Sequence, residues 1–135
     1  MYLGEIARRM IVHLAQIGCL PSELEKALSK PWSFETKHCG MITADHMPGL
    51  RFTRAILGRC FGADVNDLAD LHTINQVCCL VRDRSARQGA MISSAPLLKI
   101  GSSGLATIAV DGSVYEKMPS FQRIYKETVN RILGK

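Results

Sequence analysis

One segment constrains the fold of this chain more than any other, and it lies in a sequence otherwise patterned for helices. Residues 105–110, Leu-Ala-Thr-Ile-Ala-Val, are apolar and partly β-branched, with almost no polar alternation. That pattern predicts a strand covered on both faces. Asp111 and Gly112 follow, a dipeptide that favours a two-residue type I′ turn. Residues 113–115 are then expected to return as the second strand of a β-hairpin.

A single β-hairpin is at best marginally stable in water, so this one needs a larger sheet. The rest of the chain offers no neighbouring strands, because its patterns are helical. We therefore expect those strands to lie outside these 135 residues, and the chain to be incomplete at both ends. The predicted fold class is α/β: a mostly helical piece with one β-hairpin that belongs to a larger sheet.

Helical periodicity organises the other segments. A longer helix is expected to start between Asp64 and Leu71, to carry small residues at 85, 86, 89 and 90 for close packing, and to kink or end at Pro96. A last helix is expected after Pro119. Residues 2–17 predict an amphipathic helix ended by Gly18, whose inner stripe is Leu3, Ile6 or Ala7, Met10, Leu14 and Ile17.

Composition argues against several classes of function. The net charge is +5, but no run of five like charges exists, and nucleic-acid surfaces usually need clustered cations. The cysteine count of 5 is odd, and no C-x-x-C occurs, so neither a disulfide framework nor a zinc site is expected. The sequence contains no stretch of 18 apolar residues, so no membrane-spanning helix is predicted. Reduced thiols favour an intracellular compartment.

Four short elements, taken in order, resemble the eukaryotic-type hexokinase and glucokinase family. The resemblance extends over nearly all 135 residues. It implies that residues 1–135 are part of the large, C-terminal domain of a hexokinase, an actin-like ATPase fold (ribonuclease H-like) in which two lobes close on sugar and nucleotide. The four elements are Met1-Tyr2-Leu3-Gly4-Glu5-Ile6, then Phe34-Glu35-Thr36-Lys37 with Asp45 behind it, then Arg54-Ala55-Ile56-Leu57, and finally Val110-Asp111-Gly112-Ser113-Val114-Tyr115 before Pro119-Ser120-Phe121.

The resemblance also implies that two segments contact ATP on its adenosine side. A glycine at 112 would allow the close backbone approach that a nucleotide requires. Three positions depart from the family: Gly40 stands where serine is usual, Glu116 where lysine is usual, and Met118 where histidine is usual. Glu116 would bring negative charge near a polyphosphate, which weakens the expectation of a phosphate contact there. The residues concerned are Thr36, Lys37, His38, Cys39 and Gly40, with Asp111, Gly112, Ser113, Val114, Tyr115, Glu116 and Lys117.

By resemblance, the parent enzyme phosphorylates a hexose such as glucose to hexose 6-phosphate with ATP and Mg²⁺, the first step of glycolysis. The metal is expected to arrive with the nucleotide and to have no ligand in this segment. Catalytic and sugar-binding residues are not found: Asn66-Asp67 precedes Leu68, not the threonine of the family's base motif. The chain alone is therefore predicted to be inactive, and its partners are ATP, the hexose and the remainder of the hexokinase. The cytoplasm is the expected location, with a peroxisome-like organelle such as the glycosome as the alternative.

Two other functions stay open on the sequence. The chain could be a non-catalytic helical domain, regulatory or interaction-forming, that retains a hexokinase-like fold. The charge of +5 motivates a weaker alternative, a small helical domain that binds nucleic acid.

Overall fold

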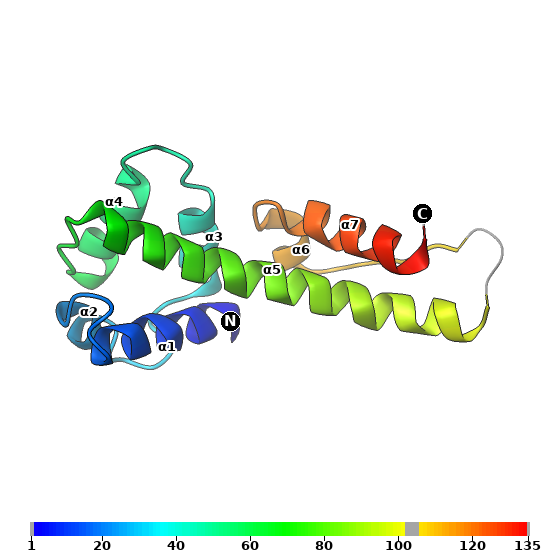
Figure 1. Ribbon diagram of the computed structural model, residues 1–135, viewed down its shortest axis with the longest axis horizontal. Helices are drawn as coiled ribbons and strands as arrows, with labels where there is room; N and C mark the ends of the chain where they lie inside the picture. Colours follow the sequence, from blue (N-terminus) through cyan, green and yellow to red (C-terminus); the bar gives the residue numbers. More distant parts are fainter. Residues whose placement is uncertain (1, 102–105, 135) are drawn as a thin grey trace. The chain divides into compact units, whose positions relative to one another are not determined.

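Seven helices make up the regular structure of residues 2–101 and 106–134, the part of the chain that the computed structural model describes. The chain divides into two units, residues 1–81 and residues 82–135. Helix α5 contributes its first part to one unit and the remainder to the other (Figure 1). The helices are α1 (Tyr2–Gln16), α2 (Glu23–Ala27), α3 (Thr36–Thr43), α4 (Arg51–Phe61), α5 (Leu68–Lys99), α6 (Ser113–Lys117) and α7 (Phe121–Leu133).

The first unit has a continuous apolar core. Helices α1 to α4 contribute to it, together with the start of α5 and the segments between them. Burying each large aliphatic or aromatic side chain stabilises the unit by about 1.5–3 kcal/mol relative to leaving it in water. The largest side chains that are fully buried are Phe34, Ile11, Leu24, Leu28, Ile42, Leu57, Leu71 and Ile74.

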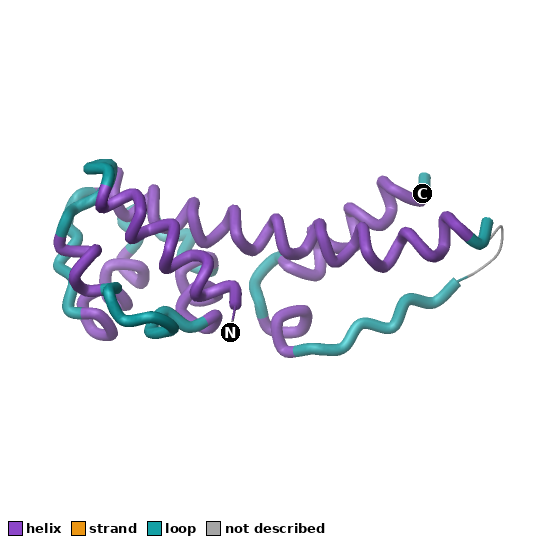
Figure 2. Tube along the Cα trace, turned by 90° about the horizontal axis from the view of Figure 1, so that it is seen from below, coloured by secondary structure: helices purple, strands orange, loops and turns teal. Residues whose placement is uncertain are grey.

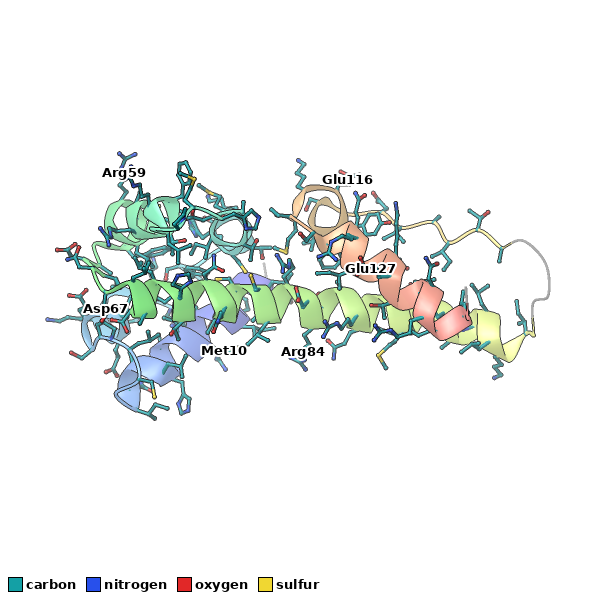
Figure 3. The ribbon with its side chains drawn as sticks, turned by 45° about the horizontal axis from the view of Figure 1, so that its top comes forward. Met10, Arg59, Asp67, Arg84, Glu116 and Glu127 are labelled. Atoms are coloured by element: carbon teal, nitrogen blue, oxygen red, sulfur yellow. The ribbon has the colours of Figure 1, made fainter. Side chains whose placement is uncertain are left out.

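Helix α1 has the predicted extent, but the predicted inner stripe is wrong for Met10 and Ile17. These side chains are 37% and 57% exposed, and Met10 is labelled in Figure 3. The buried face instead follows Ala7, Ile11 and Ala15. Gly4 explains the rotation, because a Cβ at this position would overlap the backbone of residues 34–36. The close approach of two backbones therefore decides which side of α1 faces inward.

A buried ion pair fixes the same face of α1. The Arg8 guanidinium donates two hydrogen bonds to the Glu5 carboxylate, each of 2.7 Å, and a third of 2.6 Å to the Leu28 carbonyl. Glu5 Oε2 also accepts the Trp32 amide at 2.8 Å. Hydrogen bonding from Arg8, aided by the Trp32 amide and opposed by burial, lowers the pKa of Glu5 to about 2. One charged pair thus ties α1 to the chain on both sides of Pro31.

Helix α4 is capped from outside its own sequence. Leu50, the residue before it, has φ 44° and supplies no side-chain cap. The buried Asp45 carboxylate replaces it, since Oδ2 accepts both the Thr53 amide at 2.7 Å and the Thr53 hydroxyl at 2.9 Å. Asp45 therefore satisfies an amide of the first turn that would otherwise lack a partner. Gly62, with φ 68°, ends the helix.

Helix α5 confirms the long helix predicted from residues 64–71 onward. The Asp67 carboxylate accepts the Ala69 amide at 2.8 Å and so caps its start. Pro96 lies inside the helix, which ends three residues later at Lys99. The first part of α5 joins the core of the first unit through Leu71, Ile74, Val77, Cys78 and Val81.

The second unit confirms that small residues on α5 allow close packing. Ala86 and Ala90 are fully buried, and Gly89 faces the Tyr125 ring, which a Cβ would meet at 3.6 Å. Helix α7 supplies Phe121, Ile124 and Tyr125 to this contact region. Val129, Ile132 and Leu133 further along α7 are only half-buried.

The predicted β-hairpin is wrong for the described residues. Residues 106–111 form a loop, which Figure 2 shows as a long extended segment, and residue 105 lies outside the described ranges. Residues 113–115, expected as the return strand, instead begin α6, where the Glu116 amide donates to the Gly112 carbonyl at 3.1 Å. Asp111 has no positive φ, so the type I′ turn is absent. An apolar extended segment becomes a strand only when a neighbouring strand accepts its hydrogen bonds, and the described residues supply none.

We predict that Arg8→Met lowers the free energy of unfolding by about 3–5 kcal/mol, because it leaves a buried carboxylate with only the exposed Arg9, at 3.2 Å, as a cationic partner. Replacing both partners, as in Glu5→Leu with Arg8→Met, should restore part of that loss. Denaturant unfolding followed by the fluorescence of Trp32 measures both values. A loss below about 1 kcal/mol in the single variant, the range of exposed ion pairs, would contradict the assigned role.

The same pair predicts an acid transition. The folded pKa of Glu5, about 2, lies below its ordinary value of 4.5, so its contribution is complete above pH 4.5 and is lost as the pH falls toward 2. The native chain should therefore lose stability more steeply over this interval than the double variant. Equal slopes of unfolding free energy against pH in the native chain and the double variant would argue against this role of Glu5.

Candidate functional site

The first segment predicted to contact nucleotide begins at α3, and local contacts position it. Phe34 is fully buried and anchors the chain just before the helix. Its ring stacks on Phe61 at a centroid distance of 5.4 Å. Glu35 is the N-cap residue, and its amide donates to His38 Nδ1 at 3.0 Å, one half of a capping box. The first turn of α3 therefore has a fixed start at Thr36.

Thr36 stands where α1 meets α3. The Gly4 amide donates to Thr36 Oγ1 at 3.4 Å, a long hydrogen bond; toward the other described residues the hydroxyl donates no hydrogen bond. The hydroxyl proton therefore stays available for a ligand oxygen or nitrogen. The Thr36 side chain is half-buried. Because Gly4 has no Cβ, α1 approaches the start of α3 closely enough for the Gly4 amide to donate to the Thr36 hydroxyl.

The five residues of this segment face different surroundings. Lys37 is exposed and pairs with Glu35 at 2.9 Å, and Gly40 is half-buried. His38 and Cys39 instead face the core, with 8% and 0% exposure. The Cys39 thiol lies 3.6 Å from the Cys78 carbonyl, to which it donates. Of the predicted nucleotide contacts, the side chains of Thr36 and Lys37 are thus presented to solvent, whereas His38 and Cys39 support the helix.

His38 is held in its neutral form. Burial, with the nearby Lys37 charge as a smaller cause, lowers the pKa of His38. Nδ1 accepts the Glu35 amide, so protonation would remove the acceptor. The imidazole also contacts the Phe61 ring edge-on at 5.1 Å. This histidine therefore works as a helix cap and a core side chain.

The second predicted segment runs from the loop into α6. Gly112 has φ 137° and ψ 143°, a backbone conformation open to glycine and strained for other residues. Asp111, Ser113, Glu116 and Lys117 are exposed. Glu116, on α6, is labelled in Figure 3. The Ser113 hydroxyl and the bare backbone at Gly112 are therefore available to a ligand.

Tyr115 anchors this segment within the second unit. Its ring meets the Tyr125 ring at 5.4 Å and the Phe121 ring at 6.3 Å, both nearly edge-on. An open hollow of about 640 Å³ adjoins the end of α6, and charged side chains of both signs line its walls. Two acidic and three basic side chains line it, so its positive charge is largely offset. It is lined by Glu116, Lys117, Met118, Pro119, Ser120, Gln122, Arg123, Lys126, Glu127 and Asn130.

The two predicted segments lie in different units, residues 36–40 in the first and residues 111–117 in the second. Their combination into one adenosine site therefore stays a prediction. Within the described ranges, no three His, Cys, Asp or Glu side chains are grouped so as to hold a metal ion. Among the helices of those ranges, none has the length and apolar character needed to cross a membrane.

Sequence reasoning passed over one pair of residues beside Thr36. Trp32 has φ 66°, and its ring meets the Tyr2 ring edge-on at 5.7 Å. The sequence offered one signal for this residue: Trp32 is the only tryptophan of the chain. Its contact with Tyr2 could not be read from positions 30 residues apart.

The chain belongs to the hexokinase family. The family model described as Hexokinase matches residues 1–135, which confirms the resemblance seen in the four motifs. Hexokinase-4, chloroplastic, of Oryza sativa subsp. japonica is 30% identical over 99% of this chain and 28% of its own length. Hexokinase-2 of Homo sapiens is 34% identical over 98% of this chain and 15% of its own length.

Solved structures agree with the sequence relatives. The hexokinase from Schistosoma mansoni complexed with glucose has a TM-score of 0.86, with 26% identity, over 97% of this chain and 30% of that chain. The chain thus spans less than a third of the length of these relatives. The likeness assigns this chain the fold of a hexokinase segment.

We predict that stability falls below pH 6.5 in part because of His38. Its folded pKa lies below the ordinary value of 6.5, so its contribution is complete above that pH and is lost as the pH drops through the folded pKa. His38→Gln keeps an acceptor at the third helical position but does not titrate. It should therefore flatten the dependence of unfolding free energy on pH between 7.5 and 5.

The control is His13→Gln, because His13 is an exposed histidine of α1. This variant should keep the slope of the native chain. A native slope in His38→Gln would show that burial of His38 does not govern the acid response.

Proposed function

We propose that this chain is the adenosine-binding part of an ATP-dependent hexokinase. The observation that carries the proposal is the family match over all 135 residues, joined to the two motif segments at residues 36–40 and 111–117. A hexose hydroxyl attacks the γ-phosphorus of ATP, the bond from that phosphorus to the bridging oxygen of ADP breaks, and the hydroxyl proton passes to a base. The base and the sugar-binding groups come from other parts of the enzyme.

Positioning is the contribution we assign to this chain. Phosphoryl transfer depends on holding the nucleotide in line with the acceptor hydroxyl more than on covalent chemistry by the protein. The Thr36 hydroxyl has a free proton, and Ser113 is exposed beside Gly112. These hydroxyls and the glycine backbone suit the ribose and the α-phosphate. Mg²⁺ would arrive on the phosphates, and we assign it no ligand in this chain.

Glu116 marks where the proposed site departs from its family. Its exposed carboxylate lies on α6, three residues beyond Ser113. A carboxylate repels a polyphosphate, so we place the phosphate contacts at Ser113 and the Gly112 backbone, away from Glu116.

The test uses the enzyme expressed from the coding sequence that surrounds these residues. Ser113→Ala removes one proposed hydrogen bond to the nucleotide and should raise the KM for ATP roughly threefold to tenfold, with the KM for glucose unchanged. Steady-state kinetics with each substrate varied in turn measure both. The control is Ser22→Ala, since the Ser22 hydroxyl makes no capping hydrogen bond.

Two results would overturn the proposal. One is an equal KM for ATP in Ser113→Ala and in the native enzyme. The other is the absence, in that surrounding sequence, of the Asn-Asp-Thr element that supplies the catalytic base. A non-catalytic domain with a hexokinase-like fold would then be the better description.

A further inference from the structure

Trp32 is held in a backbone conformation that disfavours it. Its φ of 66° lies in the left-handed region, where the Cβ of a non-glycine residue crowds the following carbonyl. Strain of this kind persists when surrounding contacts over-determine it, and it is often associated with binding sites. Trp32 is one of three non-glycine residues with positive φ in the described ranges, with Leu50 and Ser120.

The contacts that hold Trp32 act on its backbone. Its amide donates to Glu5 Oε2 at 2.8 Å, and Glu5 is in turn fixed by Arg8 through two hydrogen bonds of 2.7 Å. Arg8 is anchored to the Leu28 carbonyl at 2.6 Å. A buried charged network therefore sets the direction of the Trp32 side chain without using its ring.

The ring itself faces solvent. Trp32 is 49% exposed and Tyr2 is 69% exposed, and the two rings meet edge-on at 5.7 Å with planes 78° apart. We call them the aromatic pair. An edge-on contact covers a single ring face, and the exposure of both residues leaves ring surface for a flat partner.

The aromatic pair lies on the two stretches of chain that lead to Gly4 and Thr36. Tyr2 lies two residues before Gly4, whose amide donates to Thr36 Oγ1, and Trp32 lies four residues before Thr36. Lys30 is an exposed cation of the same stretch, whereas Lys37 and Glu35 pair at 2.9 Å and cancel each other. Open ring faces beside a cation match a ligand that joins a flat ring to negative charge.

We propose that the aromatic pair stacks on the adenine ring of ATP, with Trp32 as a specificity-determining contact. The inference rests on the proposed function and adds to it a base-stacking surface that the motif residues do not supply. Stacking strength grows with ring area, so stacking on Trp32 favours a purine such as adenine over a pyrimidine such as cytosine. The strain at Trp32 is retained because it points the ring at the ligand.

The chain offers its own reporter for the first experiment. Trp32 is the only tryptophan, so its fluorescence reports on this surface alone. Titrating the 135-residue chain with ATP or adenosine should quench the emission, whereas tripolyphosphate, which has no ring, should not. Equal changes with tripolyphosphate, or no change with ATP, would overturn the proposal. A phosphate-only or protein-binding surface would give such results.

The second experiment separates binding from folding. Trp32→Gly places the residue best suited to φ 66° at that position, so its melting temperature should equal or exceed that of the native chain. Its affinity for ATP by calorimetry should nonetheless fall roughly tenfold, and Trp32→Phe should recover part of the loss. Phe52→Ala removes another largely exposed ring of the first unit and should leave the affinity unchanged.

The outcomes distinguish the two proposals. Native affinity for ATP in Trp32→Gly together with weakened binding in Ser113→Ala would overturn the proposed stacking by the aromatic pair. The proposed adenosine site would still be supported. Native affinity in both variants would overturn both assignments.

Discussion

The buried ion pair between Glu5 and Arg8 is the interaction on which the first unit depends. Two charges have left water, and the cost is offset because they meet in a bidentate arrangement and each makes a further hydrogen bond to the backbone. Those further bonds run to Leu28 and Trp32. The pair therefore holds the chain on both sides of Pro31. Because this part of the chain leads directly to Thr36, it also positions the start of α3.

Gly4 and Asp45 also position parts of the chain other than their own. Gly4 lets α1 touch the backbone of residues 34–36, and Asp45 caps α4 through the Thr53 amide. Each residue serves an element to which it does not belong. His38 does the reverse, because it belongs to the predicted nucleotide segment yet caps its own helix. Residues matched to a ligand-binding motif thus divide into those that face solvent and those that build the helix presenting them.

Several features were predictable because they depend on neighbours in sequence. The extent of α1, the start of α5, the left-handed glycines at 18 and 62, and the small Gly89 of α5 that meets Tyr125 follow from local rules. The orientation of α1 did not follow, since Met10 and Ile17 fit an apolar stripe as well as Ala7 and Ile11 do. Only the backbone contact at Gly4 and the burial of Glu5 choose between these two stripes.

The sequence by itself determined the family, through four motifs in order, and with it the residues expected to meet ATP. Tertiary structure decided which of those side chains reach solvent: Thr36 and Lys37 do, whereas His38 and Cys39 are buried. It also decided that residues 106–111 are a loop and that Ser113 starts a helix. The physical reason is the same in each case. A helix closes its hydrogen bonds within its own segment, while a strand, a buried charge or a ring contact needs a partner that is distant in sequence.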